Sequence, residues 1–257
     1  MATLQAPFAA LPSLRPLPPM WRESRLPLEF ASLMRDPVWR GEGIPRGDGR
    51  PTLLICGFLA GDPSLTTMAR WLSRIGHRPV RAGLRWNVDC TGETVDRLER
   101  RVEELAARAG RRVALVGQSR GGVCARALAV RRPDLIETVV TLGSPLRDPL
   151  DVHPGVWAHV HVVGLLGSLG LPGLFSSACL TGACCERVTE DLAAPLPDEV
   201  AFTSIYSRTD GIIRWRACLD DGAEHVEVDA SHIGMAVSAP VYRATARALA
   251  PRLSAQR

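Results

Sequence analysis

The chain of 257 residues contains no lysine, so all 31 basic residues are arginine. The net charge at neutral pH is only +4, and the arginines are spread along the chain without a basic block. Because nucleic-acid binding needs a concentrated basic surface, the sequence does not predict a nucleic-acid partner. Asparagine is almost as scarce, since Asn87 is the only one. We interpret both scarcities as a mark of high-G+C coding and assign no mechanism to them.

Metal-site spacing is also missing. The seven cysteines form no C-x-x-C pair and stand beside no histidine pattern of a zinc site, so we expect no metal and no other cofactor. Two of the cysteines lie in apolar contexts and are expected to be small core residues: Cys56 and Cys124. Four others gather in the C-terminal half: Cys179, Cys184, Cys185 and Cys218. A disulfide from residues near 185 to the loop at 218 stays open.

No secretory signal is expected at the N-terminus. Five prolines interrupt residues 7–19, and no charged region precedes an apolar stretch. An odd number of cysteines without such a signal favours reduced thiols and a cytoplasmic location. We therefore interpret residues 1–22 as a loosely ordered leader, followed by a short helix over 23–34. The expected organisation is a leader with this helix over 1–50 and one domain over 51–257.

Strand and helix patterns alternate along that domain. Apolar content of 46% and charged content of 23% are ordinary for a globular protein. Strands are expected at 52–56, 78–82, 113–116, 136–142, 200–206 and 225–228. Helices are expected at 62–75, 92–109, 122–132 and 241–250. Such alternation is typical of the α/β class, with a doubly wound, mostly parallel sheet and right-handed crossovers. A Rossmann dinucleotide fold is disfavoured because no G-x-G-x-x-G follows the first strand.

One stretch breaks the alternation and carries no charge. No Asp, Glu, Lys or Arg occurs between Asp151 and Glu186, and residues 160–175 form a long apolar run. Its length approaches that of a membrane span, but its glycines and proline argue against one. We expect an inserted lid at about 146–198 that covers a hydrophobic acyl chain. The alternative is a segment that packs on the core and has no role in substrate binding.

The strand at 113–116 leads into the motif with the clearest chemical meaning. Gly117-Gln-Ser-Arg-Gly121 spells G-x-S-x-G between an apolar strand and a helical stretch. In that frame the pattern is typical of a nucleophile elbow, in which the serine stands at the apex of a strained turn. Ser119 is therefore the candidate nucleophile.

A serine hydroxyl needs a base to take its proton and an acid to orient the base. Asp210 and His232 each follow an expected strand, which brings them to the same sheet edge as Ser119. We predict Asp210 as the acid and His232 as the base. Three other aspartates near the end of the chain are weaker alternatives: Asp220, Asp221 and Asp229.

The oxyanion of an acyl-transfer intermediate needs preorganised N–H donors. We expect the backbone N–H of Arg120 to be one donor. The second should come from the loop after the first strand, where Cys56-Gly-Phe58 turns close to the site; Phe58 is the preferred donor and Leu59 the next.

With these motifs in place, the chain resembles the α/β-hydrolase superfamily, and within it bacterial lipase- and esterase-like serine hydrolases. The resemblance covers residues 52–145 and 200–250. Cys56-Gly-Phe58 is similar to the His-Gly-x oxyanion motif, with cysteine in place of histidine. Residues 205–211 and 231–235 are similar to the acid and base segments of these enzymes. Arg120 departs from the smaller or apolar residue that commonly follows the serine, and its side chain is expected to narrow the site or to pair with an acidic group.

The resemblance implies a Ser119–His232–Asp210 triad that hydrolyses carboxylic esters, lipid esters among them, through an acyl-enzyme. An acyltransferase with the same triad and a non-catalytic binding protein are the alternatives. The expected partner is a small-molecule acyl ester. No transmembrane segment is expected, transient contact with a membrane surface stays open, and the oligomeric state is not predicted.

Overall fold

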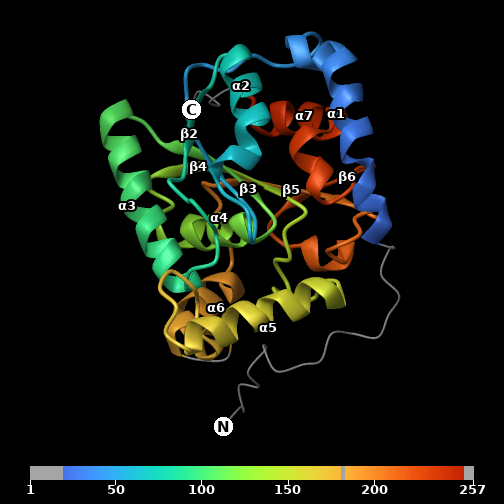
Figure 1. Ribbon diagram of the computed structural model, residues 1–257. Coiled ribbons are helices and arrows are strands. Elements are labelled where there is room, and N and C mark those ends of the chain that lie inside the picture. Colours follow the sequence, from blue (N-terminus) through green and yellow to red (C-terminus); the bar gives the residue numbers. More distant parts are fainter. Residues whose placement is uncertain (1–19, 181–182, 252–257) are drawn as a thin grey trace.

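The computed structural model describes residues 20–180 and 183–251. Its centre is a parallel sheet with the order β2-β1-β3-β4-β5-β6 (Figure 1). The strands are β1 (Pro51–Ile55), β2 (Arg78–Arg81), β3 (Val113–Gln118), β4 (Ile136–Leu142), β5 (Ala201–Ser207) and β6 (Glu224–Val228). All six lie at the expected places, so the predicted fold class is confirmed.

Helices cover both faces of the sheet. The α-helices are α1 (Leu26–Arg35), α2 (Thr66–Arg74), α3 (Thr91–Ala109), α4 (Arg120–Arg131), α5 (Pro154–Ser168), α6 (Glu186–Ala193) and α7 (Ala239–Ala248). Short 3-10 helices are η1 (Met20–Arg25), η2 (Pro37–Arg40), η3 (Asp62–Leu65), η4 (Ser177–Leu180), η5 (Ala183–Cys185), η6 (Trp215–Cys218) and η7 (Ile233–Val237). Helices α3 and α4 pack together on one face, whereas α2 and α7 pack on the other, with α1 outside α7 (Figure 1).

The central strands form because their side chains are apolar on both faces. Every residue of β1 and β3 is buried, as a parallel sheet covered by two helix layers requires. On the α2–α7 face, Trp71 is fully buried against the ring of Tyr242, with a centroid distance of 4.4 Å. The indole N–H of Trp71 donates to the carbonyl of Val38 at 2.8 Å, which anchors η2 to the core.

The direction in which the chain adds strands across the sheet reverses between β1 and β3. The chain moves from β1 outward to β2 and then returns to place β3 on the other side of β1. In an open parallel sheet, the loops that leave the carboxyl ends of strands at such a reversal diverge and leave a crevice. Here those loops follow Ile55 and Gln118, and they carry the predicted oxyanion loop and the predicted nucleophile.

Between β4 and β5 the chain makes a long excursion. Helices α5 and α6 and the short helices η4 and η5 lie together beyond one end of the sheet (Figure 1). The excursion occupies the expected place at about 146–198, and α5 is a helix that the sequence did not predict. Its role as a mobile lid stays a prediction. Among the described residues, no helix combines the length and the apolar character that crossing a membrane requires.

The N-terminal region differs in part from the expected leader. Residues 20–22 already belong to η1, and the remaining leader residues lie outside the described part of the chain. Helix α1, expected at 23–34, begins at Leu26 and ends at Arg35. Together η1 and α1 pack against η7 and α7, which brings them beside the segment that carries His232.

Candidate active site

Ser119 stands at a strained turn between β3 and α4. Its φ of 52° and ψ of −125° are unusual for a residue with a side chain. The turn is tight because the backbones of Gly117 and Gly121 nearly touch. A Cβ atom on Gly117 would lie 2.5 Å from the carbonyl oxygen of Gly121, and a Cβ atom on Gly121 would overlap the carbonyl oxygen of Ile55. The backbone N–H of Ser119 donates to Leu142 on β4 at 2.9 Å. The turn is therefore strained and closely packed, and the role of Ser119 as a nucleophile stays a prediction.

Asp210 and His232 are joined by a hydrogen bond. His232 Nδ1 lies 2.7 Å from Asp210 Oδ2, although 22 residues separate them in the chain. The other carboxylate oxygen, Oδ1, accepts the backbone N–H groups of Ile212 and Ile213 at 2.8 and 2.7 Å. Asp210 is only 1% exposed, so these contacts fix its orientation and that of the imidazole.

The surroundings of His232 raise its pKa above the ordinary value of 6.5. Burial alone would lower this pKa, because it disfavours the imidazolium. The negative charge of Asp210, the hydrogen bond to it and the charge of Glu23 outweigh burial. The site therefore stabilises a positive charge on His232.

The alternative acids lie elsewhere. Asp229 is largely exposed and bonds Arg25 and Thr209. Asp220 pairs with Arg126, and Asp221 is exposed beside Arg147. Among the predicted candidates, only Asp210 bonds His232.

The residue before the serine contacts the base segment. Gln118, the residue before Ser119, donates from Nε2 to the backbone carbonyl of His232 at 3.1 Å. Gly143 at the end of β4 has a positive φ of 55°, and a Cβ there would lie 3.1 Å from both Asp210 Oδ2 and His232 Nδ1. Within residues 20–180 and 183–251, Ser119 Oγ forms no hydrogen bond, and Ser119 lines a pocket. The hydroxyl is therefore available to a ligand.

Sequence reasoning missed the residue that connects the acid and base loops. Glu23 of η1 accepts the backbone N–H groups of Gly211, His232 and Ile233 at 3.0, 3.0 and 2.9 Å. This one carboxylate thus fixes Gly211, which follows Asp210, and also His232 and Ile233. Because the contacts span about 190 to 210 positions, no local pattern signals them.

Glu29, six residues further along the chain, makes a similar set of contacts. Its carboxylate accepts both the backbone N–H and the hydroxyl of Ser231, at 2.7 and 2.6 Å. Ser231 precedes the base, so α1 fixes the base loop from a second side. The N-terminal helices are consequently part of the scaffold of this site, whereas the sequence suggested only a leader and a short helix.

The loop after β1 contains Phe58 and Leu59, which the sequence predicts as oxyanion donors. Leu59 adopts a φ of 57°, the second positive value among the described non-glycine residues, so this loop is also strained. The side chain of Phe58 lines the same pocket as Ser119. Gly57 lies against the serine, since a Cβ there would be 3.1 Å from Ser119 Cβ. Arg120 begins α4, where a backbone N–H has no intrahelical acceptor.

Among the described residues, no acidic side chain pairs with the guanidinium of Arg120, contrary to one of the two expectations. Its guanidinium donates to the side-chain and backbone oxygens of Asn87, both at 2.6 Å, and to Thr91 Oγ1 at 3.0 Å. Asn87 in turn donates from Nδ2 to the carbonyl of Cys56 at 2.7 Å. Arg120 and the single asparagine of the chain thus brace the loop that carries Phe58. No local sequence pattern signals this role.

The pocket beside Ser119 is apolar. It has a volume of about 130 Å³. Phe58 and Val123 form part of its wall on the sheet side, whereas Val156, Phe175 and Val188 come from the β4–β5 excursion. Among the described residues that line it, Arg120 alone is charged, and the guanidinium of Arg120 is already bonded to the Asn87 segment. The pocket therefore suits a hydrocarbon group next to the serine.

Comparison with known proteins supports the fold. No protein-family model matches the chain. Mature lipase BlEst2 of Bacillus licheniformis is similar in structure, with a TM-score of 0.59, 14% identity, and coverage of 81% of this chain and 95% of the lipase. A metagenomic carboxyl esterase gives 0.59 at 15% identity, covering 88% and 90% of the two chains. A monoacylglycerol lipase of Paleococcus ferrophilus gives 0.51 at 15% identity, covering 80% and 96%. At these identities the likeness establishes the fold alone.

Proposed function

On the α/β-hydrolase fold that this chain adopts, we propose that it hydrolyses carboxylic esters through a covalent acyl-enzyme formed on Ser119. The observation that carries the proposal is the buried Asp210–His232 hydrogen bond of 2.7 Å, at the same sheet edge as the strained Ser119 turn. The lipase and esterase neighbours add support to ester hydrolysis in general.

In the proposed reaction, Ser119 Oγ attacks the ester carbonyl carbon while its proton passes to His232 Nε2. The carbonyl oxygen becomes an oxyanion, for which the backbone N–H groups of Phe58 and Arg120 are the donors. His232 then gives its proton to the departing alkoxide, which leaves as an alcohol. A water molecule then attacks the acyl carbon while His232 takes a proton from it. His232 gives this proton to Ser119 Oγ as the bond to the acyl group breaks, and the carboxylic acid is released. Asp210 stabilises the imidazolium and fixes its tautomer.

The apolar pocket supports an ester with a hydrocarbon acyl chain, lipid esters included. Its wall on the excursion side is formed by aliphatic and aromatic residues, and the outer face of α5 exposes further apolar side chains. A substrate drawn from a lipid surface would meet apolar residues on both faces of that helix. We therefore include transient contact with a lipid surface in the proposal.

The decisive experiment measures hydrolysis of p-nitrophenyl esters with acyl chains of increasing length. Ser119→Ala is expected to lower kcat by about 10⁴-fold or more, because the nucleophile is lost. Ser64→Ala removes an exposed hydroxyl that bonds only Gly61 in its own turn, and should leave kcat within about twofold. Equal rates for Ser119→Ala and the parent protein would sink the proposal.

Two further measurements distinguish the alternatives. A fluorophosphonate probe should label folded parent protein at Ser119, whereas a non-catalytic binding protein would stay unlabelled. Product analysis with an added alcohol acceptor separates hydrolysis from acyl transfer. Free acid as the main product supports hydrolysis, and a new ester as the main product supports a transferase.

A further inference from the structure

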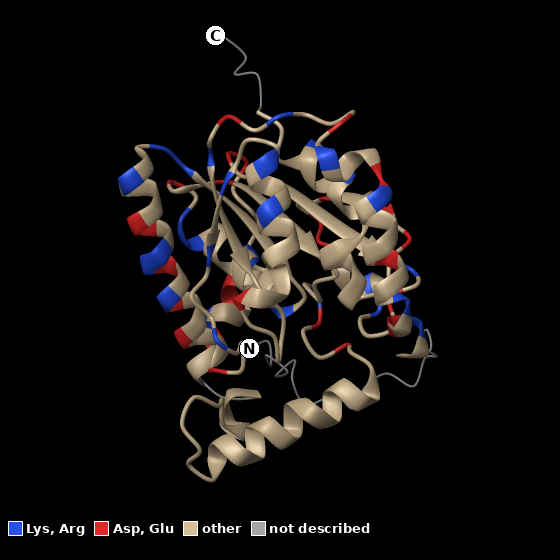
Figure 2. Cartoon of the chain, turned by 45° about the horizontal axis from the view of Figure 1, so that its top comes forward, with Lys and Arg blue, Asp and Glu red and all other residues tan. Residues whose placement is uncertain are grey.

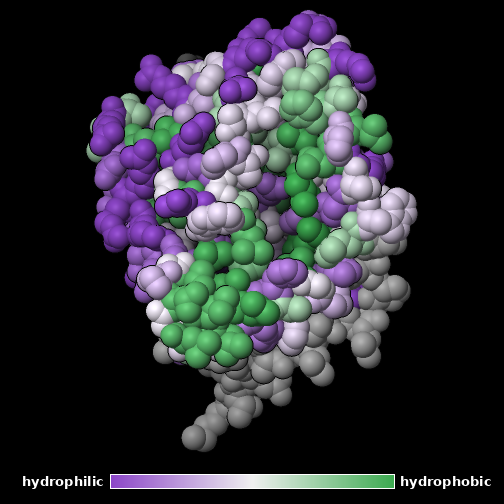
Figure 3. All heavy atoms as spheres, in the orientation of Figure 1, coloured by the Kyte–Doolittle hydropathy of each residue, from purple (hydrophilic) through white to green (hydrophobic). Residues whose placement is uncertain are grey.

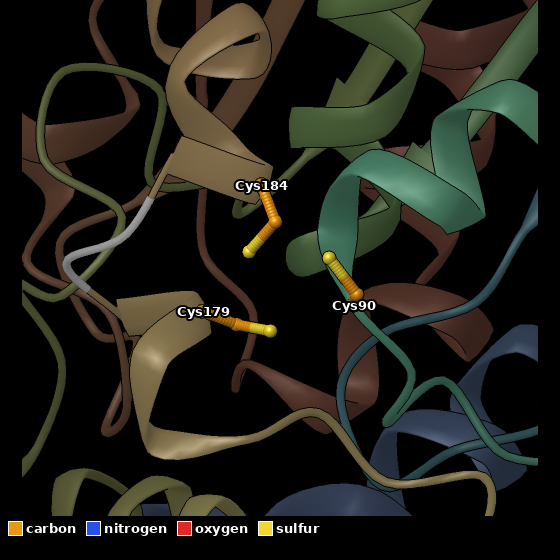
Figure 4. Close-up of side chains that lie close together, drawn as sticks. All are labelled: Cys90, Cys179 and Cys184. Carbon is orange, nitrogen blue, oxygen red and sulfur yellow. The ribbon is translucent and has the colours of Figure 1, made fainter.

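Four cysteine thiols converge beside the pocket. Cys90, Cys179 and Cys184 point toward one another, and their Sγ atoms all lie within 4.8 Å of each other (Figure 4). Cys185 joins them, with its Sγ 3.9 Å from those of Cys90 and Cys184. The grouping expected from the sequence is therefore corrected at one member: Cys218 is buried in a separate apolar cluster with Ile213 and Tyr206, and Cys90 takes its place. All seven cysteines are free, so the disulfide left open toward 218 is not formed.

The spacing of these sulfurs fits a metal better than a disulfide. A disulfide needs two sulfurs about 2.05 Å apart and leaves other thiols outside the bond. Four thiolates around zinc at about 2.3 Å form a tetrahedron with edges of about 3.8 Å. The 3.9 Å distances from Cys185 Sγ to Cys90 Sγ and Cys184 Sγ match such an edge. The three sulfur pairs among Cys90, Cys179 and Cys184 lie within 4.8 Å, so five of the six edges of a tetrahedron are close to the required length.

The thiols come from two parts of the molecule. Cys90 immediately precedes α3 in the body of the fold, whereas the other three belong to η4 and η5 of the β4–β5 excursion. The two parts are in close backbone contact here, because a Cβ on Gly92 would lie 2.5 Å from the carbonyl oxygen of Cys184. Arg120 bonds the residues on both sides of Cys90, namely Asp89 and Thr91. A guanidinium thus adjoins the segment that would carry negative thiolate charge.

We propose that Cys90, Cys179, Cys184 and Cys185 bind one zinc ion, which fastens the β4–β5 excursion to the start of α3 at the wall of the pocket. Each thiol releases a proton to solvent as its sulfur coordinates the metal. The spacing of cysteines along the sequence does not indicate such a site, because 95 residues separate Cys90 from Cys185. Two of the ligands, Cys179 and Cys185, also line the pocket, so the ion shapes the space beside Ser119. The inference does not depend on the proposed function.

The test measures metal in the full-length protein. The chain is expressed in zinc-supplemented medium, purified under reducing conditions and analysed by elemental mass spectrometry. About one zinc per chain is expected, and replacement by cobalt should give thiolate-to-cobalt charge-transfer absorption. Cys90→Ser and Cys184→Ser should each lower the zinc content at least about fivefold. Cys218→Ala, the matched control outside the cluster, should keep it, with circular dichroism checking the fold of each variant.

Three results would overturn the proposal. The first is zinc at background level in the parent protein together with no cobalt absorption, a measurement that does not depend on variants folding. The second is a free-thiol count in denatured protein that falls short, with an intact mass lowered by two hydrogens per bridge, which would identify disulfides. The third is zinc retained equally by Cys90→Ser, Cys184→Ser and Cys218→Ala, which would identify adventitious metal.

Discussion

At the scale of single residues, His232 sits between opposing influences on its pKa. Burial favours the neutral imidazole, whereas Asp210 and Glu23 favour the imidazolium, and the pKa is raised above 6.5 in total. A base must be neutral to accept the serine proton. We therefore expect kcat/KM to fall as the pH drops through this pKa, with the acid limb of the profile above pH 6.5.

Substitutions should move that limb in a defined direction. Asp210→Asn removes the largest influence that raises the pKa of His232. Because burial then dominates, the acid limb of the pH–rate profile should move to lower pH, and kcat should drop by about 10⁴-fold. Glu23→Gln removes a more distant charge and loosens three backbone contacts. We expect a smaller downward shift and a kcat loss of about 10- to 100-fold.

The control for Glu23 is Glu42→Gln. Glu42 is an exposed carboxylate that pairs only with Arg40, so neither the limb nor kcat should change. The measurement is a pH–rate profile with a soluble ester for each variant. If Glu23→Gln gave the profile of the parent protein, the role assigned to Glu23 in positioning the base would be wrong.

Asn87 allows a test of the oxyanion loop without changing a proposed catalytic group. Asn87→Asp keeps an acceptor for Arg120 but loses the donor to the Cys56 carbonyl, and Asn87→Ala loses both. We expect both variants to lower kcat by about 10- to 100-fold with little change in KM, because misplaced oxyanion donors weaken binding of the transition state alone.

A general loss of stability would give a different pattern for Asn87. If the melting temperature of Asn87→Asp dropped while kcat per folded molecule stayed at the parent value, the brace would be structural only. The steady-state parameters should therefore be measured well below the melting temperature of each variant.

The sequence allows a prediction of the site where local patterns exist. The G-x-S-x-G motif and the strand-end positions of Asp210 and His232 follow from short segments, and the structure brings the acid and base into contact. Glu23 and Asn87 could not be predicted in the same way. Their contacts join residues that are distant in sequence, and only the fold determines which backbone groups a given carboxylate or amide meets.

At the scale of elements, buried arginines attach the β4–β5 excursion to the body. Arg126 of α4 is only 3% exposed and pairs with Asp220 at 2.9 Å. It also donates to the carbonyls of Asp191 and Ala194 at the end of α6. The neighbouring Arg131 bonds the carboxylates of Asp96 on α3 and Asp191 on α6. Two residues five positions apart on α4 thus connect three helices.

Removing one partner from such a network leaves buried polar groups unpaired. We expect Arg126→Leu to lower the free energy of unfolding by about 3–5 kcal/mol. Arg147→Leu breaks a pair with Asp221, which is 93% exposed, and should change it by less than about 0.5 kcal/mol. Urea unfolding followed by fluorescence gives both values. Equal losses in the two variants would contradict the assigned role of Arg126.

The elements themselves were predictable to different degrees. The central strands were found because buried parallel strands are short, largely apolar runs. Helix α5 was missed, because its glycines and β-branched residues are poor helix formers and its apolar character extends all round. Its stability therefore comes from packing against Phe175 and the pocket, which the sequence does not reveal.

At the scale of the whole molecule, charge is distributed unevenly over the surface. Figure 2 shows basic and acidic residues on the helices around the sheet, whereas α5 carries none. Figure 3 shows hydrophobic residues gathered at the lower end of the molecule, where α5 lies in Figure 1. Four large apolar residues on or just after α5 are exposed: Val162, Leu165, Leu169 and Leu171, at 54, 56, 70 and 46%. The opposite side of the same helix reaches the pocket through Val156 and Val160.

An apolar outer face on the helix that lines the pocket suits a neutral lipid surface, since burying it there removes hydrocarbon from water without desolvating charge. We expect the parent protein to sediment with phosphatidylcholine vesicles, and Leu165→Asp with Leu169→Asp to lower the bound fraction at least about fivefold. Hydrolysis of a short soluble ester should stay within about twofold of the parent rate, because neither side chain lines the pocket.

Leu28→Asp is the matched control, since Leu28 is 74% exposed on α1, and this variant should bind vesicles like the parent protein. If the parent protein did not bind vesicles, or if the control lost binding to the same extent, contact with a lipid surface would be removed from the proposal. The proposal of ester hydrolysis would still stand.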